Sequence, residues 1–168
     1  MKIKISNLSE GTHNFRFSEP VNVVGLELPF EGNVEVEIEL KKTHNQIILD
    51  SSVSVSIVFE CDRCNGTFKK LLGTGYKMVY LQGMEPVESQ SDNIVYIPSV
   101  ADVIDISDDV RDFSILAVPM KKLCSEECKG LCSRCGKNLN EGNCSCGKDE
   151  TDVRWLPLME LKNKLNTN

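Results

Sequence analysis

Eight cysteines carry most of the chemistry available to this chain of 168 residues. They fall into four close pairs, in chain order Cys61/Cys64, Cys124/Cys128, Cys132/Cys135 and Cys144/Cys146. A tetrahedral Zn²⁺ ion with sulfur ligands at about 2.3 Å needs two thiolates from one tight turn. Cys-x2-Cys followed by glycine supplies that turn, because glycine tolerates the positive φ at its end. The spacing therefore predicts zinc binding.

The order of the pairs along the chain suggests how they share the metal. The last four cysteines are close in sequence and are assigned to one zinc site: Cys132, Cys135, Cys144 and Cys146. The remaining four would form a second, long-range site that clamps the C-terminal segment to an earlier part of the chain: Cys61, Cys64, Cys124 and Cys128. The segment 131–147 contains almost no apolar side chain apart from Leu131 and Leu139, so hydrophobic burial cannot order it. Structural zinc, at roughly 10–16 kcal/mol of apparent binding energy, is sufficient.

Three other uses of the cysteines stay open but are less favoured. Four disulfides would need an oxidising compartment, and the N-terminus alternates charged and apolar residues without a secretory signal. An iron–sulfur cluster also takes four thiolates, but Cys-x-Cys suits it poorly and the repeated Cys-x2-Cys series of ferredoxins is absent from the sequence. A thioredoxin-like pair needs a helix directly after Cys64, where the sequence Asn-Gly-Thr-Phe indicates a turn that returns to a strand.

Charge is unevenly distributed along the chain, whose formal net charge is −6. Eight acidic residues and one basic residue lie between Glu85 and Asp112, a stretch that should repel a phosphate backbone. The region 120–148 is locally basic and supplies five candidate RNA- or partner-binding residues: Lys121, Lys122, Lys129, Arg134 and Lys137. Each zinc centre with four thiolate ligands adds a charge of −2. Compensation of the thiolate charge therefore explains these basic residues as well as RNA or partner binding does.

Strands must position the first cysteine pair. Val34–Leu40 and Ser52–Phe59 alternate apolar and polar residues, the pattern of half-exposed antiparallel strands, and the second runs directly into Cys61. A following strand over 68–81 is interrupted by Gly73 and Gly75, which predict a bulge or bend. Shorter strands are expected around Ile3/Ile5, around Phe15/Phe17, over 21–28 and over 94–97. Residues 1 to about 82 therefore predict an antiparallel sheet or small barrel.

Two helices are expected after the sheet. Ser107 is predicted to cap the first, with Asp108 and Asp109 near its positive end and Pro119 ending it. Pro157 suits the first position of a short C-terminal helix. Its apolar stripe, which should dock on an apolar surface, comprises Leu158, Leu161 and Leu165 beneath Trp155. The fold class predicted is mainly β (α+β), with a β-rich domain over 1–119 and a zinc-binding segment with a C-terminal helix over 120–168.

Four stretches of this sequence resemble the YceD family, the large ribosomal RNA subunit accumulation proteins of bacteria and plastids. They are Cys61-Asp-Arg-Cys64, Ile104-Asp-Ile106, Val118-Pro-Met-Lys-Lys-Leu-Cys124 and Cys128-Lys-Gly-Leu-Cys-Ser-Arg-Cys-Gly-Lys-Asn-Leu-Asn140. The likeness is to the cysteine-rich form of Gram-positive bacteria. Two positions depart from the family pattern: Val153 replaces a proline, and Asn65-Gly66 replaces an apolar residue. The resemblance implies a role in synthesis, processing or stability of large-subunit (23S) ribosomal RNA, without a defined catalytic activity.

The leading functional prediction is a non-catalytic, cytoplasmic ribosome-biogenesis factor, not an enzyme, that binds ribosomal RNA or a ribosomal protein. Neither a membrane nor a small-molecule substrate is expected as a partner, because the sequence has no apolar run of about 18 residues and no nucleophile-elbow, phosphate-loop or dinucleotide motif. The alternative is a zinc–thiolate redox sensor or chaperone-like protein. A third class, an RNA-cleaving enzyme, would have to use the acidic stretch as a carboxylate cluster.

Overall fold

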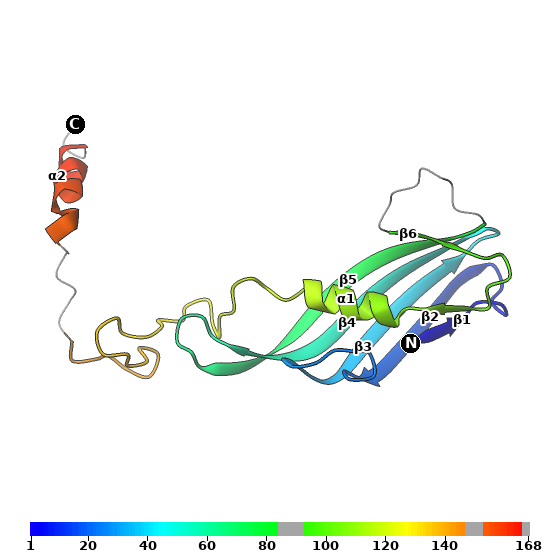
Figure 1. Ribbon diagram of the computed structural model, residues 1–168, viewed down its shortest axis with the longest axis horizontal. Helices are drawn as coiled ribbons and strands as arrows, with labels where there is room; N and C mark the ends of the chain where they lie inside the picture. The colour runs from blue at the N-terminus through cyan, green and yellow to red at the C-terminus, as the bar shows by residue number, and fades with distance from the viewer. Residues whose placement is uncertain (84–92, 147–152, 166–168) are drawn as a thin grey trace.

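An open five-stranded sheet forms the body of the protein (Figure 1). The computed structural model describes residues 1–83, 93–146 and 153–165. The strand order is β2-β3-β4-β5-β6, with all pairs antiparallel except β5–β6, which is parallel. The strands are β2 (Gly11–Pro20), β3 (Phe30–Lys42), β4 (Gln46–Glu60), β5 (Thr67–Gln82) and β6 (Ile94–Ile97). The predicted mainly β fold class is confirmed, as a sheet and not as a barrel, because β2 and β6 do not pair with each other.

The alternation in β3 and β4 divides the sheet into a buried and a polar face, as predicted. Val36 and Leu40 are buried and lie opposite the buried Val53 and Leu49 of β4. Every second residue faces solvent on the other side, and three glutamates of β3 lie there opposite Ser54, Ser52 and Asp50: Glu35, Glu37 and Glu39. A period of two places one set of side chains on each face, which fixes the register of the long strands.

The predicted bulge in β5 is wrong. The strand runs without a register shift through Gly73 and Gly75, which lie opposite Ser54 and Ser52. A Cβ at Gly75 would stand 3.2 Å from the backbone oxygen of Ser51, so this glycine allows β5 to approach β4 closely. The irregularity lies in β3 instead, between Glu31 and Val34. Residues 21–28, expected as a strand, form turns.

A short helix, α1 (Ser107–Leu116), lies on the buried face of the sheet (Figure 1). Val110 is fully buried against it, and the ring of Phe113 stacks on Tyr76 of β5 with a centroid distance of 4.4 Å. Strands β1 (Lys2–Lys4) and β7 (Val103–Asp105) pair with each other directly before the helix. The core therefore lies between the sheet and the α1 layer.

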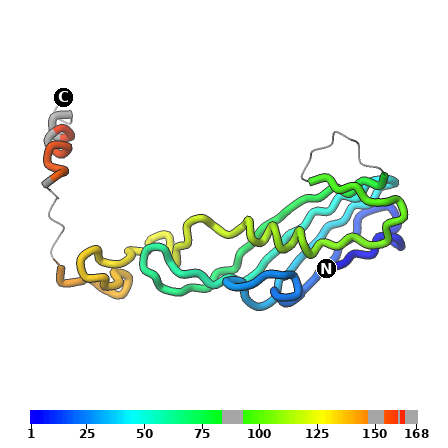
Figure 2. The backbone as a smooth tube through the Cα atoms, viewed as in Figure 1, coloured from blue at the N-terminus to red at the C-terminus, as the bar shows by residue number. Residues whose placement is uncertain are grey.

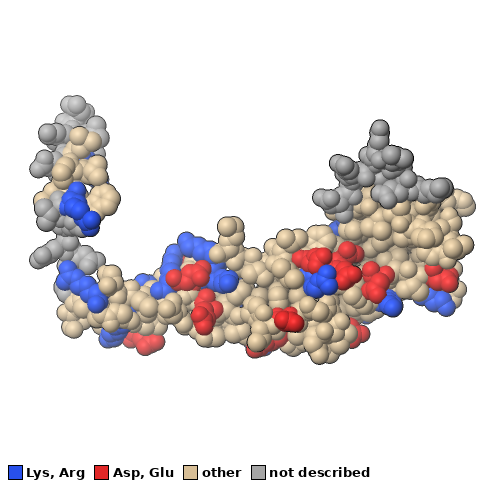
Figure 3. Space-filling view, viewed as in Figure 1, with Lys and Arg blue, Asp and Glu red and all other residues tan. Residues whose placement is uncertain are grey.

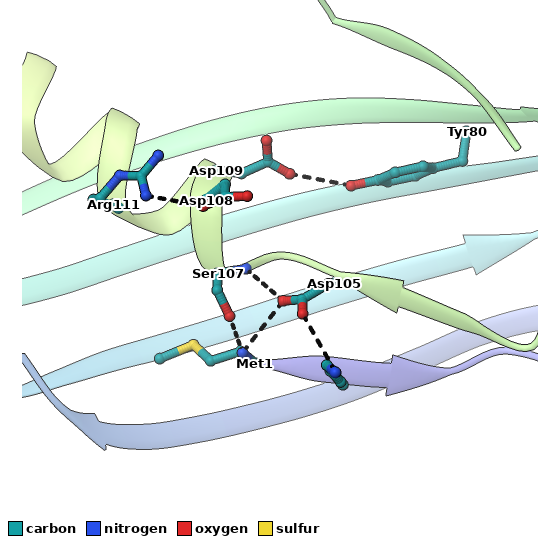
Figure 4. Close-up of polar contacts among 8 residues, drawn as sticks. Met1, Tyr80, Asp105, Ser107, Asp108, Asp109 and Arg111 are labelled. Atoms are coloured by element: carbon teal, nitrogen blue, oxygen red, sulfur yellow. Dashed lines mark hydrogen bonds and ion pairs between the residues drawn. The ribbon is translucent and has the colours of Figure 1, made fainter. Parts of the chain in front are cut away.

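Asp105, and not Ser107, accepts the first free amide of α1 (Figure 4). Ser107 is the first helical residue, so the predicted side-chain cap is wrong; its amide donates to Asp105 Oδ1 at 3.0 Å and its hydroxyl accepts from the ammonium of Met1. Burial raises the pKa of Asp105, but hydrogen bonds from Ser107 and the Met1 ammonium outweigh it and hold that pKa below its ordinary value. One turn later, Tyr80 donates to Asp109 Oδ2 at 3.2 Å.

The C-terminal part contains a 3-10 turn, η1 (Val153–Trp155), and the helix α2 (Leu156–Leu165). The helix was predicted, although Pro157 occupies its second position. Trp155, Leu158 and Leu161 are 57%, 56% and 57% exposed, so the expected apolar docking surface is not found within the described residues. The side chain of Leu165 lies outside them. Among the described residues no helix has the length and apolar character needed to cross a membrane.

Candidate metal centres

Two sets of four cysteines come together as the sequence predicted. In each set the four Sγ atoms lie within 4.8 Å of one another. Centre 1 comprises Cys61, Cys64, Cys124 and Cys128, and centre 2 comprises Cys132, Cys135, Cys144 and Cys146. They are the groups of His, Cys, Asp and Glu side chains within the described residues that could hold a metal ion.

Centre 1 joins the sheet to the C-terminal segment. Cys61 and Cys64 lie in the turn between β4 and β5, and Figure 2 shows the chain after α1 passing beside that turn. The distances from Cys61 Sγ to Cys128 Sγ and from Cys64 Sγ to Cys124 Sγ are both 3.8 Å. Sulfur atoms at about 2.3 Å from a tetrahedral ion lie about 3.8 Å apart. The thiol set therefore fits a tetrahedral ion.

The two Cys-x2-Cys turns share one backbone pattern. In centre 1 the amide of Asn65 donates to the oxygen of Cys61 at 2.9 Å, and the amide of Cys61 donates to the oxygen of Gly66 at 3.0 Å. In centre 2 the amide of Gly136 donates to the oxygen of Cys132 at 2.9 Å, and the amide of Cys132 donates to the oxygen of Lys137 at 2.8 Å.

A residue with positive φ ends each of these turns. Gly136 has φ of 70° and Asn65 has φ of 54°. Asparagine tolerates this region better than most residues, because its short polar side chain bonds locally. The departure from the family pattern at Asn65 thus leaves the first turn intact.

Backbone contacts hold the segment after α1 against the first turn. The amide of Asp62 donates to the oxygen of Lys122 at 2.8 Å, and the amide of Lys122 donates to Asp62 Oδ2 at 2.6 Å. Arg63 Nη1 donates to the oxygens of Glu126 and Cys128 at 3.0 and 2.9 Å. The amide of Leu131 donates to the backbone oxygen of Arg63 at 3.0 Å. These contacts bring the segment 122–131 against the turn of Cys61 and Cys64, as the predicted long-range site requires.

Asn140 belongs to centre 1 although the sequence did not single it out as a site residue. Its Nδ2 donates to Cys128 Sγ at 3.3 Å, and its Oδ1 accepts from the amide of Lys129 at 2.8 Å. Such a neighbour orients a ligand and stabilises its charge. The available signal was its place at the end of the run Gly-Leu-Cys-x2-Cys-Gly-x-Asn-Leu-Asn, 130–140, which is the most specific part of the family resemblance.

Centre 2 is more exposed than centre 1. Cys132 Sγ and Cys144 Sγ are 3.4 Å apart, and no cysteine of this set is buried, whereas three of centre 1 are. The loop is closed by a bridge between Leu131 and Asn138 and by a bond from Lys137 Nζ to the oxygen of Asn143 at 3.0 Å. No residue from 131 to 146 is buried, so hydrophobic burial contributes little to fixing this loop.

The thiols of each set influence one another's ionisation. Backbone hydrogen bonds lower the pKa of two of them to about 6: the amide of Cys124 does so for Cys61, and the amides of Cys135 and Arg134 do so for Cys132. Adjacent thiols and thiolates, Cys128 foremost for Cys124 and Cys135 foremost for Cys146, raise both of those pKa values to about 12. Four thiolates at these separations need a cation to share, which is the condition that a metal ion meets.

The candidate basic residues lie on the cysteine-bearing end of the protein. Figure 3 shows blue side chains around that end, with red ones among them, and red ones around α1. Lys121, Lys122, Lys129 and Lys137 make no ion pair with a carboxylate in the part of the chain that the structure describes. Arg134 lies in the turn of centre 2.

The acidic stretch is not assembled into a metal-binding cluster in the described residues. Asp108 and Asp112 pair with Arg111 at 2.9 and 3.0 Å, and Asp109 accepts from Tyr80. Glu85, Glu88 and Asp92 lie outside the described residues. These contacts give the described aspartates structural partners at the start of α1.

Comparisons with known proteins agree with the family resemblance. The family model described as "Large ribosomal RNA subunit accumulation protein YceD" matches residues 49–162. A chloroplastic YCED homolog 1 of Arabidopsis thaliana is 26% identical, covering 79% of this chain and 49% of its own length. The Zea mays protein of the same name is 24% identical, covering 67% and 48%. An uncharacterized protein of Mycobacterium tuberculosis is 20% identical, covering 76% and 61%.

The chain spans about half the length of the two plant relatives. No solved structure matches. The matched region 49–162 contains all eight cysteines and most of the sheet, and it is more than half of the chain. On that match, this protein belongs to the YceD family of large ribosomal RNA subunit accumulation proteins.

Proposed function

We propose that this protein is a non-catalytic factor that supports the accumulation of large-subunit (23S) ribosomal RNA by binding ribosomal RNA or a ribosomal protein in the cytoplasm. The observation that carries the proposal is the family match over 49–162, which includes both cysteine centres. The plant relatives are named for the same role. The exposed bases near the centres, among them Lys121 and Lys129, would contact an anionic partner.

Each centre would hold one structural Zn²⁺ ion. Four thiolates complete a tetrahedral shell, whereas catalytic zinc keeps one position open for water or substrate. Both sets supply four sulfur atoms, so neither leaves a position for a reactant. This supports a binding role and not an enzymatic one.

The chain would divide into a β-rich domain over 1–119 and a zinc-bearing segment over 120–168, and the contacts at centre 1 would join the two. In this scheme the sheet is stabilised by its own buried side chains, whereas the segment is stabilised by metal. Removal of zinc by a strong chelator is then expected to expose 120–146 to protease and leave the sheet resistant, as peptide mapping by mass spectrometry would show.

Depletion of the protein tests its function directly. We expect lower 23S ribosomal RNA levels, with 16S levels unchanged, and sedimentation of the wild-type protein with precursor particles of the large subunit. A Cys61→Ser/Cys64→Ser variant should fail to restore the RNA, whereas Lys4→Gln, far along the chain from both centres, should restore it. Normal 23S levels on depletion, together with no sedimentation with these particles, would contradict the proposal.

Exposed thiols at both centres favour a second candidate, a zinc–thiolate redox sensor or chaperone-like protein. Cys124 and Cys135 are exposed, so an oxidant can reach one ligand of each set. Mild peroxide would then release zinc and change the protein's effect on 23S RNA. Retention of both ions at peroxide concentrations that oxidise a free surface thiol would eliminate this candidate.

A further inference from the structure

A pocket of about 280 Å³ lies beside centre 1, between the end of the β4–β5 hairpin and the segment 119–126. Its lining combines apolar side chains, among them Phe59, Phe68 and Leu123, with three lysines: Lys70, Lys121 and Lys122. Glu126 is the carboxylate that lines it. The volume is near the lower end of ligand pockets, about 300 Å³. It therefore suits a single small group and not a whole helix.

The three lysines have no carboxylate partner among the described residues, although the chain as a whole is acidic. Their neighbour Lys69 differs, because it pairs with Glu31 at 3.5 Å. Like charges gathered around one concave site repel one another, and an anion relieves that repulsion. The pocket is thus electrostatically suited to a phosphate or a carboxylate.

Lys122 is held in place on both sides of its backbone. Its amide and its carbonyl oxygen bond to Asp62 of the first cysteine turn at 2.6 and 2.8 Å. Its Nζ stands 5.6 Å from the ring centroid of Phe59, a cation–π contact. This ammonium is therefore positioned before a ligand arrives, and its position depends on centre 1.

The wall of the pocket distinguishes between anions. The rings of Phe59 and Phe68 lie 5.8 Å apart, tilted by 50°. Phe59 is buried, whereas Phe68 and Leu123 are partly exposed and form the accessible apolar surface. A nucleotide has both matching parts: a flat base that packs on an aromatic side chain and a phosphate for the ammonium groups. An acidic peptide would use the charges but leave the apolar wall uncovered.

We propose that this pocket binds one unpaired nucleotide of single-stranded RNA, with its phosphate at Lys70, Lys121 and Lys122 and its base against Phe68. A base in a duplex is stacked within the helix and cannot enter, so the ligand is a single-stranded region. The inference rests on the proposed function, since it identifies RNA as the partner of the cysteine-bearing end. It adds residues of β4 and β5, Phe59, Phe68 and Lys70, to the basic residues that the sequence indicated as partner-binding.

Fluorescence anisotropy with a labelled oligouridylate of twelve nucleotides and the full zinc-loaded chain tests the pocket. The triple variant Lys70→Gln/Lys121→Gln/Lys122→Gln removes the ammonium groups that would neutralise this one phosphate. The slope of log affinity against log salt should then decrease by about 0.7, which corresponds to about fivefold weaker binding at 0.1 M salt. The matched control changes three lysines on other parts of the sheet region and should bind like the wild type: Lys4→Gln/Lys41→Gln/Lys77→Gln.

A second variant tests the apolar wall. Phe68→Leu keeps an apolar side chain but removes the aromatic face, so single-stranded binding should weaken at least about fivefold. Binding of a duplex RNA of the same length should not change. Thermal unfolding of each variant shows whether the fold is retained.

Three results would overturn the pocket assignment: equal binding by the triple variant and its control, no effect of Phe68→Leu in a folded protein, or preference for a polyglutamate peptide over RNA. Sedimentation with large-subunit precursors separates this from the proposed function. If the triple variant still sediments with the particles and binds the oligonucleotide normally, only the pocket assignment is refuted, and the proposed function stands. If the wild type binds the oligonucleotide but not the particles, the proposed function fails.

Discussion

Gly130 is the position where one methyl group should most disturb centre 1. It has φ of 75°, and a Cβ added there would stand 2.9 Å from the backbone oxygen of Arg63. That oxygen already accepts from the amide of Leu131 at 3.0 Å. Gly136 offers a matched control, because its φ is 70° and a Cβ there would meet nothing within 4 Å. Alanine is strained at both positions but collides with a neighbour only at Gly130.

The two substitutions should therefore differ in cost. An L-residue in the left-handed region costs about 1–2 kcal/mol. For Gly136→Ala that strain is the whole effect. For Gly130→Ala the backbone must also shift and the Leu131 hydrogen bond weakens, which adds about 1 kcal/mol. Since 1.4 kcal/mol is about tenfold, we expect roughly 30- to 150-fold weaker zinc binding at centre 1 and roughly 5- to 30-fold weaker binding at centre 2.

Stepwise zinc release to a chromogenic chelator measures both affinities. A Cys132→Ser/Cys135→Ser protein, which keeps centre 1 alone, assigns the two release steps. Circular dichroism should show the same strand content in all variants, because neither glycine lies in the sheet. If Gly130→Ala weakened centre 1 no more than Gly136→Ala weakens centre 2, the close packing of Gly130 on Arg63 would have no energetic role, and the reasoning would be refuted.

Three further changes test other parts of the structure. Elemental analysis should find two zinc ions per chain, and one in Cys132→Ser/Cys135→Ser; an unchanged ratio would mean that the sets do not bind metal separately. Burial, and then the nearby aspartates, raise the pKa of Asp109, so its ionised form is disfavoured in the folded state at pH values above that pKa. Asp109→Asn keeps an acceptor for Tyr80 and should thus stabilise the protein at pH 7 but not below the ordinary carboxyl pKa of about 4, as urea unfolding at pH 7 and 3 would show. Leu49→Ala removes a fully buried side chain and should cost roughly 2–5 kcal/mol in urea unfolding; a loss below about 1 kcal/mol would place Leu49 outside the core.

The parts of the fold that the sequence predicted correctly are those fixed by side-chain period. The alternation around Val36 places four side chains of β3 on the buried face, and a slip of one residue would expose all of them: Val34, Val36, Ile38 and Leu40. The predictions that were wrong depend on partners far along the chain. Gly75 indicated a bulge or bend locally, but β5 pairs with β4 there without a register shift, and a Cβ at Gly75 would stand 3.2 Å from the backbone oxygen of Ser51. Ser107 had the right type for a cap, but the Met1 ammonium takes its hydroxyl.

The grouping of the cysteines was predictable because closeness in sequence allowed few alternatives. The contacts around them were not. Asn140 lies beside Cys128 Sγ only because centre 2 folds back on the chain, and Lys70 lies beside Lys122 only because β5 passes the segment after α1. Spacing identifies ligands, whereas their neighbours depend on tertiary structure.

The sequence distance across centre 1 has a consequence for synthesis. Cys64 and Cys124 are 60 residues apart, so the ribosome produces the whole sheet and α1 before the second half of the ligand set exists. A nascent or truncated chain that ends between α1 and Cys124 contains every strand of the sheet but only half of the ligand set, Cys61 and Cys64. Zinc at centre 1 would then be bound only by chains that include Cys124 and Cys128, and chains that end earlier would keep Cys61 and Cys64 as free thiols open to oxidation.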